Sequence, residues 1–358
     1  MGTQQKKLDL RFGIHNFENI VVNNPEGVLV SSGSTINNVT CIQGVLAYTS
    51  GGIHGFTLEE DMVYEGDLIV GGGTLNLNGH SLHVKGNFSI TGGILNMTQE
   101  LDYLLVEGDF NMSSNLNHTG KLTNGTLEVR GDFTQSGESY SFAASGNHKV
   151  VLSGDTAQTV SFASSINSCF QDVEFQNQEK IIITSSVCIA GACVQRCPVE
   201  GWIAVTDTTS FEANTCDVNI RLLGKITLAE DLTINGSLQM AESTSIALNG
   251  YTLTVNGDVS LEEFSSIHIQ KGHLDCGSVS GETWSGIYMT NEEDQCTVKG
   301  DITFPYTYHC FQQGYLKVAG DCSFNTGIFN SKAFFTFVKV LVEPVPFNIS
   351  ILNEIVLP

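Results

Sequence analysis

The chain has 358 residues, of which 41% are hydrophobic and 15% charged, and its 38 acidic and 16 basic side chains give a formal net charge of −22. A surface this acidic repels phosphate groups, so we expect no nucleic-acid binding and no attachment to an anionic membrane. No apolar run approaches the ~20 residues of a transmembrane helix, so we also expect no membrane insertion.

Residues 1–57 contain short apolar pieces at irregular spacing, such as residues 20–22 and 28–30, separated by turn-forming segments. This pattern predicts an irregular N-terminal β region that caps a repeat array. Residues 1–7 include lysines but no apolar stretch follows them, so no signal peptide is visible. We expect the chain to be a segment of a longer secreted protein, with neighbouring segments as partners.

A seven-residue motif, Leu-x-Val-x-Gly-Asp-Phe, recurs along the rest of the chain. Its clearest copies are residues 82–88, 104–110, 127–133, 253–259 and 316–322, and weaker copies are residues 62–68, 150–156 and 296–302. The motif glycines are Gly66, Gly86, Gly108, Gly131, Gly154, Gly257, Gly300 and Gly320. The period of roughly 20–23 residues is typical of architectures in which successive repeats stack on one another.

Apolar residues alternate with polar ones on both sides of each Gly-Asp pair, as in strands with one buried face. The sequence therefore predicts an all-β, single-stranded parallel β-helix (β-solenoid) with one coil per period. Leu82 would then lie near Leu104 and Leu127. The alternative is an antiparallel meander with one hairpin per period, in which Asn78-Gly79 and Asn249-Gly250 form the turns. We prefer the solenoid, because Gly79 and Gly250 each stand seven residues before a motif glycine.

The repeat defines the remaining regions. We expect solenoid coils in residues 58–160 and again in 226–330. Residues 161–225 break the period and hold five of the ten cysteines, which indicates divergent coils and a Cys-rich insertion at 190–215. Loops on a rigid scaffold commonly bind partners, so we expect specific contacts there. Residues 331–358 are apolar and β-prone, as in a C-terminal β cap or a truncated continuation of the array.

The Leu-x-Val-x-Gly-Asp-Phe coils, together with residues 147–154 and 158–162, resemble repeats in very large surface or secreted proteins of anaerobic gut Firmicutes. They are also similar to the β-helical shafts of filamentous-haemagglutinin-type adhesins and polymorphic toxins. The resemblance covers residues 58–185 and 226–330. It implies a stalk or display role and brings no catalytic residue with it.

Acidic residues recur at one motif position. They are Asp67, Asp109, Asp132, Asp155, Asp258, Asp301 and Asp321, and Asn87 fills the same position in one copy. Stacked carboxylates can share Ca²⁺, which makes a calcium-stabilised β-roll an alternative. We prefer a turn role, because Asn87 suits a turn equally well and the glycine-rich nonapeptide of calcium-binding β-rolls is absent.

The cysteines do not have the spacing of a zinc site. Cys188, Cys193 and Cys197 are separated by four and three residues, whereas zinc fingers and ribbons use closer pairs. For the cysteine cluster in residues 188–216 we expect buried thiols or one disulfide. Cys296 and Cys322 replace the Leu and Phe of the motif, so we expect them in the core.

Polysaccharide lyases and glycoside hydrolases also use parallel β-helices, so a carbohydrate-active enzyme is the main rival. Such enzymes need paired carboxylates or a cation site with a base. The acidic runs at 59–61, 262–263 and 292–294 are typical of solvated faces, and Arg130 and Arg221 lie in no known motif. We therefore single out no catalytic, cofactor-binding or metal-ligating residue and expect no cofactor.

The sequence favours a non-enzymatic structural or adhesive segment of a surface-displayed or secreted repeat protein, acting as a stalk, an adhesin or a carrier for an effector domain. Its expected location is extracellular or at the cell surface. Its expected partners are a host or cell-surface protein or carbohydrate.

Overall fold

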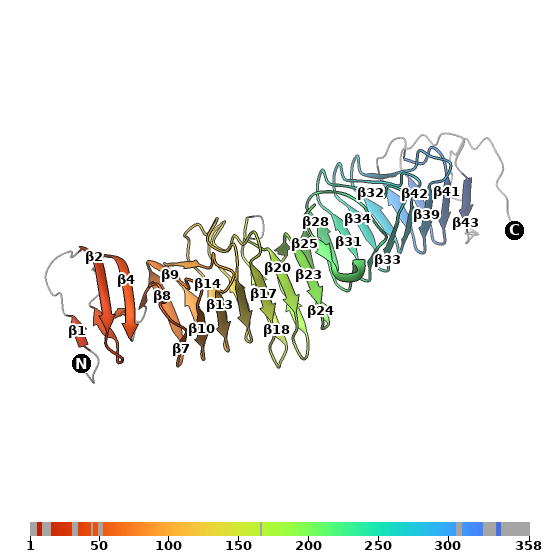
Figure 1. Cartoon of the computed structure of the whole chain (residues 1–358). Coiled ribbons are helices and arrows are strands. Elements are labelled where there is room, and N and C mark those ends of the chain that lie inside the picture. Colours follow the sequence, from red (N-terminus) through yellow and green to blue (C-terminus); the bar gives the residue numbers. More distant parts are fainter. Residues whose placement is uncertain are drawn as a thin grey trace. The chain divides into compact units, whose positions relative to one another are not determined.

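The computed structural model describes residues 6–8, 16–30, 35–43, 46–48, 53–164, 167–305, 310–324 and 334–337. The chain divides into two compact units, Met1–Gly201 and Trp202–Pro358. Within each unit, parallel strands of successive coils lie side by side in register, which is a parallel β-solenoid (Figure 1). The predicted fold class is confirmed and the antiparallel meander is wrong.

A regular coil contains two strands, one on either side of a corner that begins with glycine, and in many coils a third strand follows. In one coil, β10 (Ser81–Val84) precedes the corner, β11 (Phe88–Ile90) follows it and β12 (Ile94–Asn96) completes the turn. We call the three stacks of strands the pre-corner sheet, the post-corner sheet and the third sheet.

In unit 1, the pre-corner sheet contains β7 (Met62–Tyr64), β10, β13 (Tyr103–Val106), β15 (Thr126–Val129), β17 (Lys149–Leu152), β20 (Asp172–Phe175) and β23 (Ala192–Gln195). The post-corner sheet contains β1 (Lys6–Leu8), β3 (Val28–Val30), β5 (Leu46–Tyr48), β6 (Ile53–His54), β8 (Leu68–Gly72), β11, β14 (Phe110–Met112), β16 (Phe133–Gln135), β18 (Gln158–Phe162), β21 (Ile181–Ile183) and β24 (Val199–Glu200). The other strand pairs of this unit are β9 (Thr74–Asn76) with β12, β2 (Asn16–Asn23) with β4 (Thr35–Gln43), and β19 (Cys169–Phe170) with β22 (Val187–Ile189).

In unit 2, the pre-corner sheet contains β27 (Thr215–Cys216), β30 (Leu232–Ile234), β33 (Thr252–Val255), β36 (His273–Cys276), β39 (Gln295–Val298), β41 (Tyr315–Val318) and β43 (Phe334–Phe337). The post-corner sheet contains β25 (Trp202–Val205), β28 (Asn219–Leu222), β31 (Leu238–Met240), β34 (Val259–Leu261), β37 (Val279–Gly281), β40 (Ile302–Phe304) and β42 (Cys322–Phe324). The third sheet contains β29 (Lys225–Thr227), β32 (Ser245–Ala247), β35 (Ser266–His268) and β38 (Gly286–Tyr288). Strand β26 (Ser210–Phe211) and a short 3₁₀ turn, η1 (Glu212–Asn214), precede β27.

The register places like residues on like residues. Leu82 pairs with Leu104, and Leu104 with Leu127, as the repeat predicted. The alternation of polar and apolar residues explains the burial, because every second side chain of a strand points inward. Phe88, Phe110 and Phe133 have no exposed surface. Their ring centroids lie 5.7 and 4.9 Å apart from one coil to the next. Burying each such side chain contributes about 1.5–3 kcal/mol to folding, so the stacked interior is the main source of stability.

The motif glycines are required chiefly because successive coils come close together. The backbone N–H of Gly131 donates to the carbonyl of Gly108 at 3.0 Å. A Cβ on Gly131 would lie 2.5 Å from both the Gly108 carbonyl oxygen and Oδ1 of Asp109. Gly66 has a φ of 100°, in the left-handed region that side chains disfavour.

Strands are present in three regions for which the sequence predicted an insertion or a cap. Residues 190–215, expected as an inserted loop, contain strands β23 to β26, η1 and the start of β27. In the N-terminal region, β5 and β6 form an antiparallel pair through Ala47 and Ile53. In the C-terminal stretch, β43 pairs in parallel with β41. The rest of the predicted C-terminal region 331–358 lies outside the described residues.

Candidate functional site

In unit 1, the polar residue of each corner binds the next coil. Oδ1 of Asp67 accepts the backbone N–H of Asn87 at 2.7 Å, and Oδ1 of Asn87 accepts the N–H of Asp109 at 2.8 Å. The series continues from Asp109 to Asp132 at 2.8 Å and from Asp132 to Thr159 at 2.7 Å. We call this series the corner ladder. Each rung satisfies a backbone donor that the corner would otherwise leave to solvent.

The predicted member Asp155 is not part of the ladder. Phe133 pairs with Val160, so Thr159 occupies the rung after Asp132. The segment between the two strands is four residues longer in this coil, with residues 153–159 opposite residues 130–132, and its Gly-Asp pair imitates the motif out of register. Oδ1 of Asp155 instead accepts a hydrogen bond from the Gln178 side chain at 2.6 Å.

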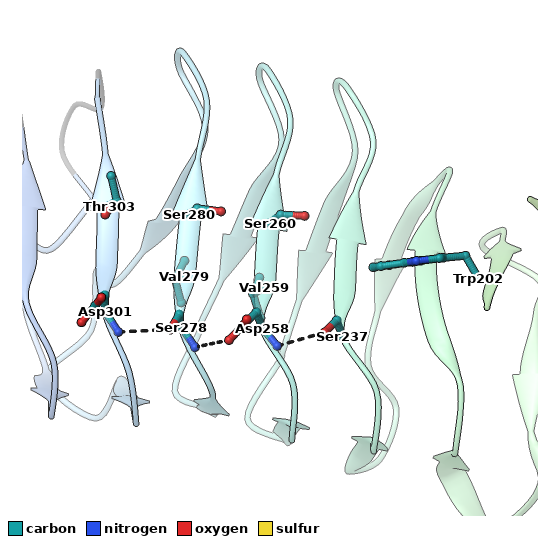
Figure 2. A pocket seen from close by; sticks show the side chains of 10 residues that line it. All are labelled: Trp202, Ser237, Asp258, Val259, Ser260, Ser278, Val279, Ser280, Asp301 and Thr303. Carbon is teal, nitrogen blue, oxygen red and sulfur yellow. Dashed lines mark hydrogen bonds between the residues drawn. The ribbon is translucent and has the colours of Figure 1, made fainter. Parts of the chain in front are cut away.

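The ladder of unit 2 is built in the same way from a more mixed set of residues. Its rungs join Asn219 to Ser237 at 2.9 Å, Ser237 to Asp258 at 3.2 Å, Asp258 to Ser278 at 2.8 Å, Ser278 to Asp301 at 3.2 Å, and Asp301 to Asp321 at 2.8 Å. Three of these bonds are drawn in Figure 2. Sequence reasoning missed the serine members, although Gly236-Ser237 and Gly277-Ser278 repeat the Gly-x corner.

The ladder geometry supports the turn interpretation of the acidic positions. One oxygen of Asp67, Asp109, Asp132, Asp258 and Asp301 is already occupied by a neighbouring N–H. Among the described residues, no group of three or more His, Cys, Asp or Glu side chains is arranged to hold a metal ion.

Two aspartates lie inside the solenoid, and one of them, Asp294, belongs to an acidic run that was expected to form a solvated face. Asp102 is 1% exposed and accepts the backbone N–H groups of Gly79 at 2.6 Å and Gln99 at 2.9 Å. Asp294 is fully buried and accepts three, from Lys271, Thr290 and Asn291, at 2.6–2.9 Å. Buried carboxylates are tolerated when hydrogen bonds replace their hydration. The repeated pattern Met-Thr-x-Glu-x-Asp at 97–102 and 289–294 was the available signal.

The cysteines are divided between one disulfide and buried thiols. Cys169 and Cys188 are paired residues of β19 and β22 and form a disulfide. Cys193 and Cys216 are buried free thiols and Cys197 is half-buried. Cys193 and Cys216 are the buried thiols expected for the cluster at 188–216, whereas Cys188 is bonded to Cys169, outside that cluster, and Cys197 is only partly buried. Cys296 is fully buried in the motif Leu position, and Cys322 pairs with Ile302 in the Phe position.

Burial also controls the chemistry of the thiols. It raises the pKa of Cys216, Cys276 and Cys322 to about 12. A thiol is a strong nucleophile only as the thiolate, so these groups are poor nucleophiles at neutral pH.

The isolated charges noted in the sequence form ion pairs on outer faces. Arg221 contacts Glu262 at 3.0 Å across two coils, and Arg130 lies 3.8 Å from Glu128. Glu128 also accepts hydrogen bonds from the Tyr103 hydroxyl at 2.6 Å and from Ser153 at 2.7 Å. Burial, followed by the Glu128 contact, raises the pKa of Tyr103 to about 12, so its hydroxyl stays a proton donor.

The outer face of the post-corner sheet in unit 2 contains a shallow depression. Its lining residues are Trp202, Ser237, Asp258, Val259, Ser260, Ser278, Val279, Ser280, Asp301 and Thr303. Trp202 pairs with Asn219 and so occupies the corner-ladder position of its coil. Figure 2 shows the indole at one end of a row of small hydroxyl side chains. The signal in the sequence was Gly201-Trp202, a Gly-Trp in place of Gly-Asp.

Known protein families, curated proteins and solved structures include no match to this chain. The structure bears out the β-solenoid fold that the resemblance implied. Within the described residues, no helix is long and apolar enough to span a membrane.

Proposed function

We propose that this chain is a non-enzymatic structural and adhesive segment of a surface-displayed or secreted repeat protein. The corner ladder is the observation that carries the proposal. In each unit, corner side chains such as Asp109 and Asp258 are used to fasten one coil to the next. Together with the stacked phenylalanines, this arrangement favours a stiff scaffold whose outer faces present side chains to partners.

The Cys169–Cys188 disulfide supports an extracellular or cell-surface location. Disulfides persist in oxidising compartments and are rare in the cytosol of most cells. The acidic surface supports solubility and repulsion from anionic polymers. We therefore propose host or cell-surface carbohydrate or protein as the partner, with neighbouring segments of a longer chain.

The deciding experiment measures whether the protein binds a polysaccharide or cleaves it. The purified chain is incubated with immobilised plant and animal polysaccharides, and bound protein, new reducing ends and unsaturated products are measured. The proposal expects retention on at least one surface without product. Turnover that is abolished by one Asp or Glu substitution would instead identify a carbohydrate-active enzyme.

Calcium provides a separate test. Because the ladder carboxylates already accept backbone N–H groups, we expect a chelator to leave the melting temperature unchanged. A large drop in melting temperature that Ca²⁺ reverses would support a calcium-stabilised β-roll instead.

A further inference from the structure

The depression on the post-corner sheet of unit 2 combines an aromatic platform with an ordered polar surface. Trp202 is 37% exposed. It occupies the corner position at which the next two coils carry the polar ladder residues Asn219 and Ser237. A tryptophan offers no acceptor to the ladder. Its large apolar face therefore has a different use from the other residues of that position.

The polar groups beside Trp202 have unused hydrogen-bonding capacity. Among the described residues, the hydroxyls of Ser260, Ser280 and Thr303 have no hydrogen-bond partner, and Figure 2 shows them on the same sheet as the ladder. Asp258 and Asp301 each give one oxygen to the ladder, at 2.8 Å, and both side chains are exposed. Their second carboxylate oxygens are available to a ligand.

The spacing of these groups follows the solenoid. Adjacent coils are about 4.8 Å apart, so Asp258 and Asp301, which are separated by the Ser278 coil, repeat at roughly 10 Å. A polymer whose units advance by about one coil can therefore meet equivalent groups several times. The row of lining residues runs along several coils, from Ser237 to Asp301, which suits a chain more than a compact ligand.

We propose that this face binds a glycan chain that carries free amino groups, with a sugar ring on the Trp202 indole and ammonium groups at Asp258 and Asp301. The inference rests on the proposed adhesive function and names its ligand class.

Three chemical features of such a chain match the site. The C–H face of a sugar stacks on indole, its hydroxyls pair with the serine and threonine row, and its ammonium groups neutralise the carboxylates. An ammonium beside an aromatic face also gains cation–π attraction. Polyanionic chains are disfavoured by the same carboxylates and by the net charge of −22.

A basic peptide fits this surface less well. The backbone groups of the inner post-corner strands β28, β31, β34, β37 and β40 are already paired on both sides within the sheet. A peptide lying across the face therefore cannot add as a strand and would be held by side chains alone.

The test uses the only two tryptophans of the chain, Trp202 and Trp284. In a Trp284→Phe variant, indole fluorescence reports on Trp202 alone. This variant is titrated with a glucosamine hexasaccharide at mildly acidic pH, and with the N-acetylated hexasaccharide of the same length. We expect the amino form to change the fluorescence and to bind at least about tenfold more tightly than the acetylated form.

Two charge variants locate the site. Asp258→Asn with Asp301→Asn should weaken binding about tenfold or more, and should leave the melting temperature unchanged because Asn87 shows that an amide oxygen serves as a rung. Asp109→Asn with Asp132→Asn removes the same charge from unit 1 and should leave binding unchanged. Trp202→Ala, measured by calorimetry, should also weaken binding about tenfold.

Equal binding of the acetylated chain, or equal loss in both charge variants, would overturn the inference. So would an absence of binding by the intact chain. If the hexasaccharide is not bound and no polysaccharide is cleaved, the ligand assignment fails but the scaffold proposal stands. If the hexasaccharide is cleaved, the scaffold proposal fails.

Discussion

The backbone N–H of Asp132 donates a hydrogen bond of 2.8 Å to Oδ1 of Asp109, which occupies the same corner of the preceding coil. This contact lets the side chain of one repeat complete the backbone bonding of the next. We expect Asp109→Ala to lower the free energy of unfolding by about 1 kcal/mol, because the N–H loses its acceptor at an exposed site. Urea denaturation would measure the loss. Asp109→Asn is the matched control and should cost much less, since Asn87 already acts as a rung.

The corner glycines should tolerate no side chain. Gly131→Ala places a Cβ 2.5 Å from Asp109 Oδ1, so the coils must separate or the rung must break. We expect a loss of about 1–3 kcal/mol, as for other overpacked positions. Thermal unfolding of Gly131→Ala and Gly72→Ala gives the comparison, because a Cβ on Gly72 meets nothing closer than 4.0 Å. Equal stability of the two variants would contradict this account.

The buried Asp102 should be sensitive to loss of its charge. In Asp102→Asn one carboxylate oxygen becomes an amide donor that faces the N–H of Gly79 or Gln99. We expect a loss of about 1–3 kcal/mol, the cost of a buried donor without an acceptor. Glu100→Gln, an exposed neighbour in the same turn, should change the urea midpoint little. A neutral effect of Asp102→Asn would show that the turn rearranges.

The chain should lose stability in mild acid through His148. Burial lowers the pKa of His148 to about 4, and neither ring nitrogen has a hydrogen-bond partner in the described structure. In the unfolded state the pKa of this histidine has the ordinary value of 6.5. The folding stability that depends on a neutral His148 is therefore fully present above pH 6.5 and is lost as the pH falls toward 4. Between pH 7 and 5 we expect a loss of about 2 kcal/mol from this group.

The variant His148→Leu isolates that contribution. Its ring neighbour Phe142 lies 6.0 Å away between centroids, so an apolar replacement fits the surroundings. Denaturation midpoints of both proteins are compared across this pH range. The variant should show a shallower pH dependence, whereas parallel curves would place the acid sensitivity elsewhere, for example at His118, whose pKa burial also lowers.

The disulfide should contribute through the loop it closes. Cys169 and Cys188 are 19 residues apart, and closing a loop of this size stabilises a protein by about 2–4 kcal/mol. We expect the double variant Cys169→Ala and Cys188→Ala to lose that amount of unfolding free energy and to melt at a lower temperature. Cys197→Ser, at a half-buried free thiol, is the control. Thiol counting under denaturing conditions would contradict the assignment if all ten cysteines reacted without a reductant.

The sequence predicted the fold because two periods agreed. Alternation of period two identified the inward faces, and recurrence of Leu82, Leu104 and Leu127 fixed the register between coils. The recurrence of Asp and Asn at one motif position likewise predicted turns. The sequence could not show that the side-chain oxygens of these residues accept backbone N–H groups of the next coil. That contact joins residues about 20 positions apart and depends on how closely two coils approach.

The missed features lie where the local pattern and the register disagree. Gly154-Asp155 has the motif composition, but extra residues in that coil place Thr159 at the corner. Asp294 belongs to an acidic run, and only its position in the coil separates it from the exposed Glu292 and Glu293. Trp202 was hidden because its coil has no aspartate to mark the corner.

The corner ladder also has a direction. The acceptor always belongs to the coil nearer the N-terminus and the donor to the coil that follows, from Asp67 through Asp132 and from Asn219 through Asp321. A coil that has already formed therefore presents a finished template to the segment synthesised after it. Assembly can proceed one coil at a time as the chain emerges from a ribosome or a secretion channel, without waiting for the C-terminal end.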